Sequence, residues 1–475
     1  MPTAAETFAA WLLGVGPADI PDDLRADARF RVLDVLGNIL AGSREPLGAA
    51  ILRAAPALGT GDEACLLHSG DRVPAPTAAL VNGTFGHALD YDDTHNATLV
   101  HPSVPVVVTA LAVGEGISLD GDALLAAVVA GNEVFCRLGM VAPMAFHRSG
   151  LHPTSVLGPP ATALVSAKVL GLEPAEAVHA AGISGSQASG ILESFSDGTW
   201  VKTLHPGWAA HGGIIAARLA MAGFTGPATV FEGRFGLFRS HVQREGEALD
   251  IDALTHDLGR HWEARACSLK PYACAHVIHP YVDLALGLHS EGVGAEAVTR
   301  IVAPIRPGYI PVVGAPREVK IAPRTPTHAR ASLPYCIAAA LLRGRLDLAG
   351  FSREAIAEPA VRTLAAKIEV VEDTTETAAG QFRGELTVEL ADGTRLHRSQ
   401  EHNRGSVANP LSENEITGKF RENAAGTLFD RGASRVVEAC LALGTGATAA
   451  DLIETCLAGA RERAQAGPTT ITSVR

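Results

Sequence analysis

The chain has 475 residues, which exceeds the size at which one hydrophobic core stops growing, so two domains are expected. Hydrophobic residues make up 47% and aromatic residues 5%, a composition that suits closely packed helices and excludes a largely disordered chain. The formal net charge is −12 and no Lys/Arg-rich run is present, which argues against nucleic acid or an anionic membrane as the partner.

Cysteine usage and the chain start indicate a cytoplasmic protein. The seven cysteines show no spacing pattern, which favours reduced thiols, and the absence of a CxxC pair argues against a cysteine-ligated zinc or iron–sulfur cluster. The stretch MPTAAETFAAWLLGV carries no basic residue before its apolar patch, unlike a signal peptide. No apolar run reaches membrane-spanning length, so we expect no membrane partner.

The first half of the chain is expected to be helical. Apolar residues recur at helical spacing over 24–40, and Ser118 is expected to cap a nearly all-apolar, buried helix over 119–138. Two more helices are predicted over 160–170 and 206–222, because a glycine suited to a helix C-terminus follows each of them. The second would carry its proline in the first turn.

Short strands and helices alternate after residue 267. Residues 385–390 alternate apolar and polar side chains and lead into Asp392-Gly393, which predicts a β-hairpin with a strand over 394–398. Further strands are predicted over 300–304, 309–313 and 368–371, and helices over 332–342 and 352–367.

Helical patterning returns near the end of the chain. The letters SENE from Ser412 form a capping box for a helix over 412–421, and helices over 436–443 and 449–464 follow. Residues 467–475 are expected to pack loosely. We therefore predict a mainly α fold, with a large all-helical domain plus a smaller inserted α+β lid domain. The predicted boundaries are 1–266 and 404–475 for the helical domain and 267–403 for the lid domain.

Ionisable and hydroxyl side chains are most densely grouped in residues 87–103, HALDYDDTHNATLVHPS. Three aspartates, three histidines and two threonines stand between apolar runs, inside a chain that is 19% charged. Burying such groups is costly unless they are paired or used, which makes the segment a candidate for proton transfer or ion ligation. A salt-bridged loop that caps two helices is the structural alternative.

Three further segments carry candidate residues. His152 precedes Pro153 in a predicted loop; Lys202 and His205 stand just before a predicted helix N-terminus, where an anion is favoured. The segment SLKPYACAHVIHP adds a lysine among apolar neighbours. The structural alternatives are a solvated histidine, a surface lysine at a glycine-rich helix junction, and a lysine whose stem packs beside buried histidines. Lysines, histidines and an aspartate pair together suit a di- or tricarboxylate substrate.

Several of these segments resemble the MmgE/PrpD family. They are NGTFGHALDYDDTHNATLVHPS, GLHPTSVLGPPATA, DGTWVKTLHPGWAAHGG, FTGPATVFEGRFG, LKPYACAHVIHP and NPLSENEITGKF, in order over most of the chain. The family includes 2-methylcitrate dehydratase, cis-aconitate decarboxylase and iminodisuccinate epimerase. The resemblance implies a homodimer with a large helical domain and a smaller lid domain, and neither a metal nor an organic cofactor.

The resemblance also implies site residues. The catalytic set would be Asp90, Thr94, His101, His152, Lys202 and Lys270, and the substrate-binding set would be His95, His205, Tyr272 and His276. Two departures concern the substrate wall. His95 stands where the decarboxylase and some dehydratases carry a tryptophan, and the interval from Asp90 to His101 is one residue longer than in the decarboxylase.

The expected function is a cofactor-independent lyase that acts on a small anionic carboxylate, most of all a 2-methylcitrate dehydratase-like enzyme. Decarboxylation of cis-aconitate and an iminodisuccinate-type epimerisation are alternatives within the family. In the expected mechanism, the two lysines anchor carboxylates and stabilise developing charge, and His101 or His152 moves the proton. Asp90 orients a histidine, and Thr94 hydrogen-bonds the substrate. A metal-dependent hydrolase built on DYDDTH with His101 and a non-catalytic binding protein are the alternatives from other classes.

Overall fold

The structure, a computed structural model, describes residues 1–243 and 246–465. The chain forms two compact units. Unit 1 comprises Met1–Leu192, Trp200–Arg265 and Ser412–Arg475, and unit 2 comprises Glu193–Thr199 and Ala266–Leu411. The loose packing expected of residues 467–475 lies outside the described residues.

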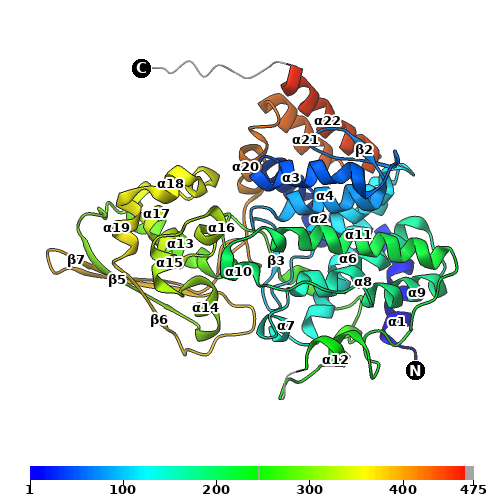
Figure 1. Cartoon of the computed structure of the whole chain (residues 1–475), viewed down its shortest axis with the longest axis horizontal. Helices are drawn as coiled ribbons and strands as arrows, with labels where there is room; N and C mark the ends of the chain where they lie inside the picture. Colours follow the sequence, from blue (N-terminus) through cyan, green and yellow to red (C-terminus); the bar gives the residue numbers. More distant parts are fainter. Residues whose placement is uncertain (244–245, 466–475) are drawn as a thin grey trace. The chain divides into compact units, whose positions relative to one another are not determined.

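Unit 1 is built from helices, as the mainly α prediction requires (Figure 1). From the N-terminal and middle parts of the chain they are α1 (Ala4–Gly14), α2 (Asp22–Gly42), α3 (Pro46–Ala54), α4 (Ala75–His87), α5 (Ser103–Glu115), α6 (Gly121–Met140), α7 (Ala145–Arg148), α8 (Pro153–Leu170), α9 (Pro174–Gly185), α11 (Val201–Met221) and α12 (Leu237–His241). Strands here are two residues long: β1 (Ala64–Cys65), β2 (Arg72–Val73) and β3 (Thr94–His95).

The centre of unit 1 is a close packing of α11 against α4, α8 and α9. Small residues make this approach possible. A methyl group added at Gly207 of α11 would lie 2.2 Å from the carbonyl oxygen of Leu80 in α4, and one added at Gly83 would lie 2.6 Å from the Cα of Gly207. The Gly- and Ala-rich composition therefore sets how near α4 and α11 stand, and both helices carry residues of the candidate site.

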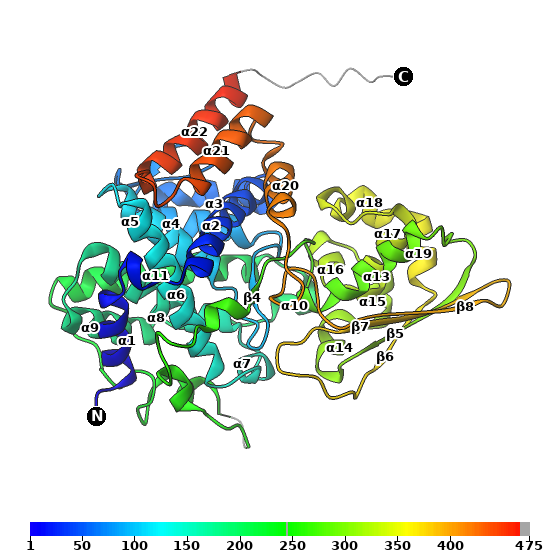
Figure 2. The ribbon, with the colours of Figure 1, turned by 180° about the vertical axis from the view of Figure 1, so that it is seen from behind.

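The C-terminal helices belong to unit 1. They are α20 (Glu413–Ala424), α21 (Asp430–Leu441) and α22 (Ala449–Gln465). Helices α20 and α21 pack against α2, and α22 packs against α5 and α21 (Figure 2). Ser412 caps α20 and forms the predicted capping box with Glu415.

Helix α6 is long and apolar enough to cross a membrane by length and composition alone. Within the described residues, 89% of its apolar window is buried inside the protein. A core helix that is covered on every side passes the same compositional test.

Unit 2 contains a four-stranded sheet of order β6-β5-β7-β8. Its strands are β5 (Val298–Ile305), β6 (Ile368–Glu372), β7 (Gly384–Leu390) and β8 (Arg395–Gln400), and a two-residue strand β4 (Cys267–Ser268) precedes the sheet in the chain. Strand β5 runs parallel to β6 and antiparallel to β7, and the β7–β8 pair is the predicted hairpin, with Gly393 at φ +87°.

Helices cover one face of this sheet. Helix α13 (His279–Ser290) packs on β7 and β8, and α17 (Leu333–Arg343) packs on α13 and β6. The remaining helices of unit 2 are α10 (Ser194–Asp197), α14 (Ile310–Val313), α15 (Arg317–Ile321), α16 (Pro326–Arg330), α18 (Arg353–Ala357) and α19 (Pro359–Ala365). Every second residue of β7 is buried up to Val388, which is the alternation expected of a sheet covered on one side.

Four predicted helix starts are wrong. Helix α21 begins at Asp430, six residues before the predicted start at 436. The other three show how a local signal can mislead. Asp120, not Ser118, caps α6, because Ser118 has a positive φ of 50° while Asp120 accepts hydrogen bonds from two backbone N–H groups. Helices α8 and α11 begin seven and five residues before the predicted starts at 160 and 206, at Pro153 and Val201. Their internal prolines are tolerated inside the helix, where burial outweighs the missing hydrogen bonds.

Two further predictions in unit 2 are wrong, also because of proline. Residues 309–313 form a 3-10 turn and α14 in place of a strand, since Pro311 lacks the N–H that a sheet needs but suits a first helical turn. The helix predicted over 352–367 is interrupted, because Pro359 begins the new helix α19 after α18 ends.

The contact between α4 and α11 yields a stability prediction. Gly207→Ala should lower the free energy of unfolding by about 1–3 kcal/mol, because the added methyl group meets backbone that cannot move aside. Gly418→Ala in α20 is the matched control, since nothing lies within 4 Å of its added methyl group, and it should stabilise the protein by about 0.4–1 kcal/mol. Urea unfolding of both variants measures this, and a Gly207→Ala protein as stable as wild type would contradict the packing described.

Candidate functional site

The acidic loop between α4 and α5, residues 88–102, forms the floor of the candidate site. Asp90 adopts a positive φ of 51°, and so does Leu99 at 57°, a conformation that Asp tolerates better than most residues. Asp92, Asp93 and Thr94 are buried, while the side chain of Asp90 is 26% exposed. The loop therefore separates its aspartates into two buried ones and one that solvent can reach.

Asp93 holds the loop in place. Its carboxylate lies 2.6 Å from the guanidinium of Arg31 in α2 and accepts hydrogen bonds from the backbone N–H and the hydroxyl of Ser103, at 3.1 and 2.6 Å. Asn132 of α6 donates to the same hydroxyl. Burial raises the pKa of Asp93, and Arg31 and Ser103 act in the opposite direction. This aspartate matches the structural alternative considered for the segment, a salt-bridged loop that caps a helix.

His87, at the end of α4, connects a carboxylate to a lysine. Its Nδ1 lies 2.8 Å from Asp92, whose carboxylate accepts, so Nδ1 carries a hydrogen. Its Nε2 lies 2.9 Å from Nζ of Lys202, which donates to the remaining lone pair. The ammonium of Lys202 also lies 3.5 Å from Asp90. His87 therefore links the carboxylate of Asp92 to Lys202 and positions the positive charge of that lysine.

His101 lies in the same group with a defined tautomer. Its Nδ1 is 2.7 Å from the backbone carbonyl oxygen of Asp93, which can only accept, so Nδ1 carries a hydrogen. Thr94 lies 3.3 Å from the same nitrogen through Oγ1, and the backbone N–H of His101 donates to Thr154. In the neutral ring Nε2 then carries the lone pair, which is what a general base requires.

His152, the residue before α8, contacts His205 of α11. The two Nδ1 atoms are 3.0 Å apart, and both rings are buried. Burial and the nearby charge of Lys202 lower the pKa of His152 well below its usual value. Burial, His87 and Lys202 lower the pKa of His205 to about 3. Both rings are consequently neutral near pH 7.

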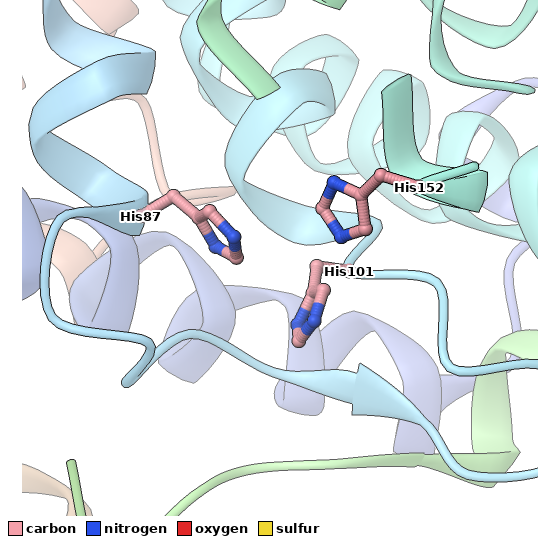
Figure 3. Close-up of side chains that lie close together, drawn as sticks. All are labelled: His87, His101 and His152. Carbon is pink, nitrogen blue, oxygen red and sulfur yellow. The ribbon is translucent and has the colours of Figure 1, made fainter. Parts of the chain in front are cut away.

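The rings of His87, His101 and His152 form one cluster (Figure 3). His87 and His101 have ring centroids 4.9 Å apart, and His152 lies 5.6 Å from the first and 5.9 Å from the second. The residues come from the end of α4, the residue two before α5 and the residue before α8. Chain segments far apart in the sequence thus bring three imidazoles within contact of one another.

Helix N-termini surround this cluster. The helix α5 begins two residues after His101, α8 begins one residue after His152, and Lys202 is the second residue of α11. The prediction that Lys202 stands just before the helix is therefore wrong, because Lys202 lies inside the first turn of α11. Helix N-termini favour anions, and the partly exposed ammonium of Lys202 adds a full charge. The cluster can hold an anion although the chain as a whole is acidic.

His95 has protein partners at both ring nitrogens. Its Nδ1 is 2.8 Å from Oγ1 of Thr98, and its Nε2 is 3.5 Å from the carboxylate of Glu263. The side chain is fully buried. Both contacts hold the ring in place, and substrate contact by His95 stays a prediction.

The remaining predicted residues lie in unit 2. Lys270 is buried in the segment that follows β4. The hydroxyl of Tyr272 donates to Asp283 at 2.6 Å and accepts from Arg404 at 3.0 Å, while His276 contacts Asn403 at 2.9 Å. Tyr272 and His276 therefore take part in hydrogen bonds within unit 2, and their substrate role stays a prediction.

The donor set can be compared with what a metal ion needs. One ligand atom each from His87, His101 and His152 lies within 4.8 Å of the others, as do atoms of His87, Asp90, Asp92 and His101. Both sets depend on His87, whose nitrogens face Asp92 and the ammonium of Lys202. A cation at this nitrogen would meet a lysine at 2.9 Å, so the chemistry of this donor set does not fit a metal ion.

Sequence reasoning did not select His87 and Asp92 as site residues. Both belong to the selected segment 87–103, but neither is among the site residues that the family resemblance implies. The available signal was spacing: a histidine at the end of a helix with an aspartate five residues later can turn back onto it, as the 2.8 Å contact shows.

Comparison with known proteins shows the family of the chain. Residues 6–249 match the MmgE/PrpD N-terminal domain, and residues 272–443 match the MmgE/PrpD C-terminal domain. The chain is 27% identical to a cis-aconitate decarboxylase-like protein of Aspergillus oryzae, over 93% of this chain and 95% of that protein. It is also 27% identical to the cis-aconitate decarboxylase of Aspergillus terreus, with 90% of each chain covered. It is 28% identical to the human cis-aconitate decarboxylase, over 88% and 87%.

The role of Asp93 generates a prediction. Asp93→Ala should lower the free energy of unfolding by about 3–5 kcal/mol, because it leaves the buried guanidinium of Arg31 with one carboxylate fewer. Asp90→Ala is the matched control from the same loop; its side chain is partly exposed, so stability should change by less than about 1 kcal/mol. Chemical denaturation compares the two, and equal losses would refute the division between buried and accessible aspartates.

The lowered pKa of His205 predicts how stability depends on pH. Between pH 6.5 and about 3 the unfolded chain binds a proton at this residue and the folded chain does not, so stability falls as the pH falls. The contribution is at most about 1.4 kcal/mol per pH unit. His205→Asn cannot titrate and should show a shallower fall between pH 6.5 and 4. Unfolding free energies at several pH values test this, and parallel curves for the two proteins would contradict it.

Proposed function

Because the chain belongs to the MmgE/PrpD family, we propose that it is a cofactor-independent lyase acting on a small di- or tricarboxylate. One observation carries the proposal: the ammonium of Lys202 stands 2.9 Å from His87, beside two further imidazoles and three helix N-termini. The set supplies positive charge for a carboxylate and nitrogen bases for a proton. Those are the two requirements of bond cleavage next to a carboxylate.

Charge stabilisation falls to Lys202. When a bond to the carbon beside a carboxylate breaks, negative charge develops on that carbon and spreads onto the carboxylate. A Lys–carboxylate pair at about 4 Å gains roughly 4 kcal/mol at an effective dielectric near 20. The ring of His87 holds the ammonium at 2.9 Å, and Asp90, at 3.5 Å, is placed to orient it and offsets part of its charge.

Proton transfer falls to His101 or His152. In its neutral form His101 has its lone pair at Nε2, because its Nδ1–H is donated to the backbone carbonyl oxygen of Asp93. Thr94 lies beside this ring and is proposed to hydrogen-bond the substrate as well. Elimination of water needs a base at the carbon and an acid at the leaving hydroxyl, and loss of CO2 needs one proton delivered to carbon. A pair of histidines serves either reaction.

Decarboxylation of cis-aconitate is the first reaction that we propose. Its support is that similar proteins matching nearly the whole length of the chain carry the name cis-aconitate decarboxylase. Dehydration of a 2-methylcitrate-like hydroxy acid, which the sequence analysis favoured, is the second candidate. What favours it is the accumulation of imidazoles, since that reaction uses an acid and a base together.

The resemblance adds further proposals about unit 2 and about the assembled protein. Lys270 is proposed as a second carboxylate-binding lysine, and unit 2 as a lid. A homodimer in the cytoplasm, with a small carboxylate as its partner, completes the proposal.

A substrate panel with matched variants tests the function. The purified protein should consume cis-aconitate and release CO2, followed by proton NMR, with 2-methylcitrate and iminodisuccinate assayed in parallel and with no loss of rate in a chelator. Lys202→Ala should lower kcat/KM by about 10²–10³-fold, because the carboxylate loses its cation. Arg218→Ala removes a cation from the same helix, paired there with Glu63, and should leave the rate unchanged.

Two results would contradict the proposal. One is a folded wild-type protein that turns over none of the three compounds. The other is a loss of melting temperature in Lys202→Ala that accounts for its loss of activity, which would make Lys202 a structural residue.

A further inference from the structure

The contact between His152 and His205 carries information beyond the residues already assigned. Their Nδ1 atoms are 3.0 Å apart, with ring centroids at 5.1 Å and a tilt of 38°. His152 is 1% exposed and His205 5%. A nitrogen–nitrogen hydrogen bond needs one donor and one acceptor, so one of the two Nδ1 atoms carries a hydrogen and the other presents a lone pair.

The position of His205 argues against direct contact with substrate. Its Nδ1 is taken by His152, and its Nε2 lies close to Gly190, since a methyl group added there would lie 3.4 Å from it. The same methyl group would lie 2.3 Å from the hydroxyl of Ser155, so this corner is tightly filled. His205 thus contacts the cluster through His152. Figure 3 shows His152 beside His87 and His101.

The surroundings of the pair keep both rings neutral, so either ring can accept a hydrogen bond at Nδ1. Lys202 lies on the same helix as His205, three residues earlier, and lowers the pKa of both rings together with burial. A neutral His205 can accept a hydrogen bond at Nδ1, which a protonated ring cannot do. If His152 donates from Nδ1, its own Nε2 keeps the lone pair and is available as a base.

Resting on the proposed function, we propose that His205 is a positioning residue that acts through His152. It accepts the Nδ1–H of His152, holds that ring in place and fixes the tautomer whose Nε2 is a base. When Nε2 takes a proton, His152 becomes an imidazolium whose Nδ1–H is still donated to the neutral His205. When the proton is returned to carbon or to a leaving hydroxyl, the pair is restored, so the only proton exchanged is the one at Nε2.

A tautomer measurement tests this without any substrate. In histidine labelled with ¹⁵N, the wild-type protein should show His152 protonated at Nδ1 and unprotonated at Nε2, with assignment by a His152→Gln variant. His205→Leu removes the acceptor, and His152 should change to the Nε2–H form that free histidine prefers. His205→Asn keeps an oxygen acceptor near the same place and should retain the wild-type tautomer.

Kinetics on the substrate found in the panel give the second readout. His205→Leu should lower kcat by about 10–100-fold with KM within about twofold, and His205→Asn should recover most of kcat. An Nε2–H tautomer in the wild type, or a tautomer that His205→Leu leaves unchanged, would overturn the proposal. So would a rise in KM with unchanged kcat, which would make His205 a substrate contact.

The two proposals fail in different ways. A wild-type protein that is inactive on the whole panel but shows the expected tautomers would refute the proposed function and leave the pairing of His152 with His205 intact. An active enzyme with the wrong tautomer would do the opposite.

Discussion

The buried carboxylates in and around the acidic loop each need a cation or a hydrogen-bond donor as partner. This requirement connects several helices of unit 1. Asp93 is matched by Arg31 and Ser103, Asp92 by His87, and Asp34 of α2 by Lys419 of α20, whose ammonium also donates to the carbonyl oxygen of Tyr91. An unpaired buried carboxylate would cost several kcal/mol. The partners come from helices distant in sequence, so satisfying the loop ties α2, α4, α5 and α20 together.

The same requirement prepares the site electrostatically. Because Asp92 engages His87 at Nδ1, the other nitrogen of this ring is directed to Lys202, and the ammonium is held where three helices begin. His152 and His205 stay neutral near pH 7, since burial and the lysine both disfavour a second positive charge. The result is a cation held beside three imidazoles, with the carboxylates of Asp90 and Asp92 next to it.

This arrangement explains why one scaffold suits several reactions beside a carboxylate. A fixed cation stabilises the charge that develops in water elimination, CO2 loss and epimerisation alike. What differs between them is which group leaves and where the proton is delivered. Under the proposed function, those choices depend on the side chains around the substrate more than on the shared cluster.

Local patterns in the sequence were enough to predict the mainly α class, the hairpin at Asp392-Gly393 and the capping box at Ser412, and to select the segment 87–103, because each depends on neighbouring residues. Sequence reasoning misplaced helix starts at prolines, where tertiary burial outweighs local propensity. It could not tell Asp93, a structural aspartate, from Asp90, which solvent reaches, since the difference lies in Arg31, 62 residues away. No local pattern could predict that His87 joins Asp92 to Lys202 or that His205 contacts His152, because those contacts join helices that are far apart in the sequence.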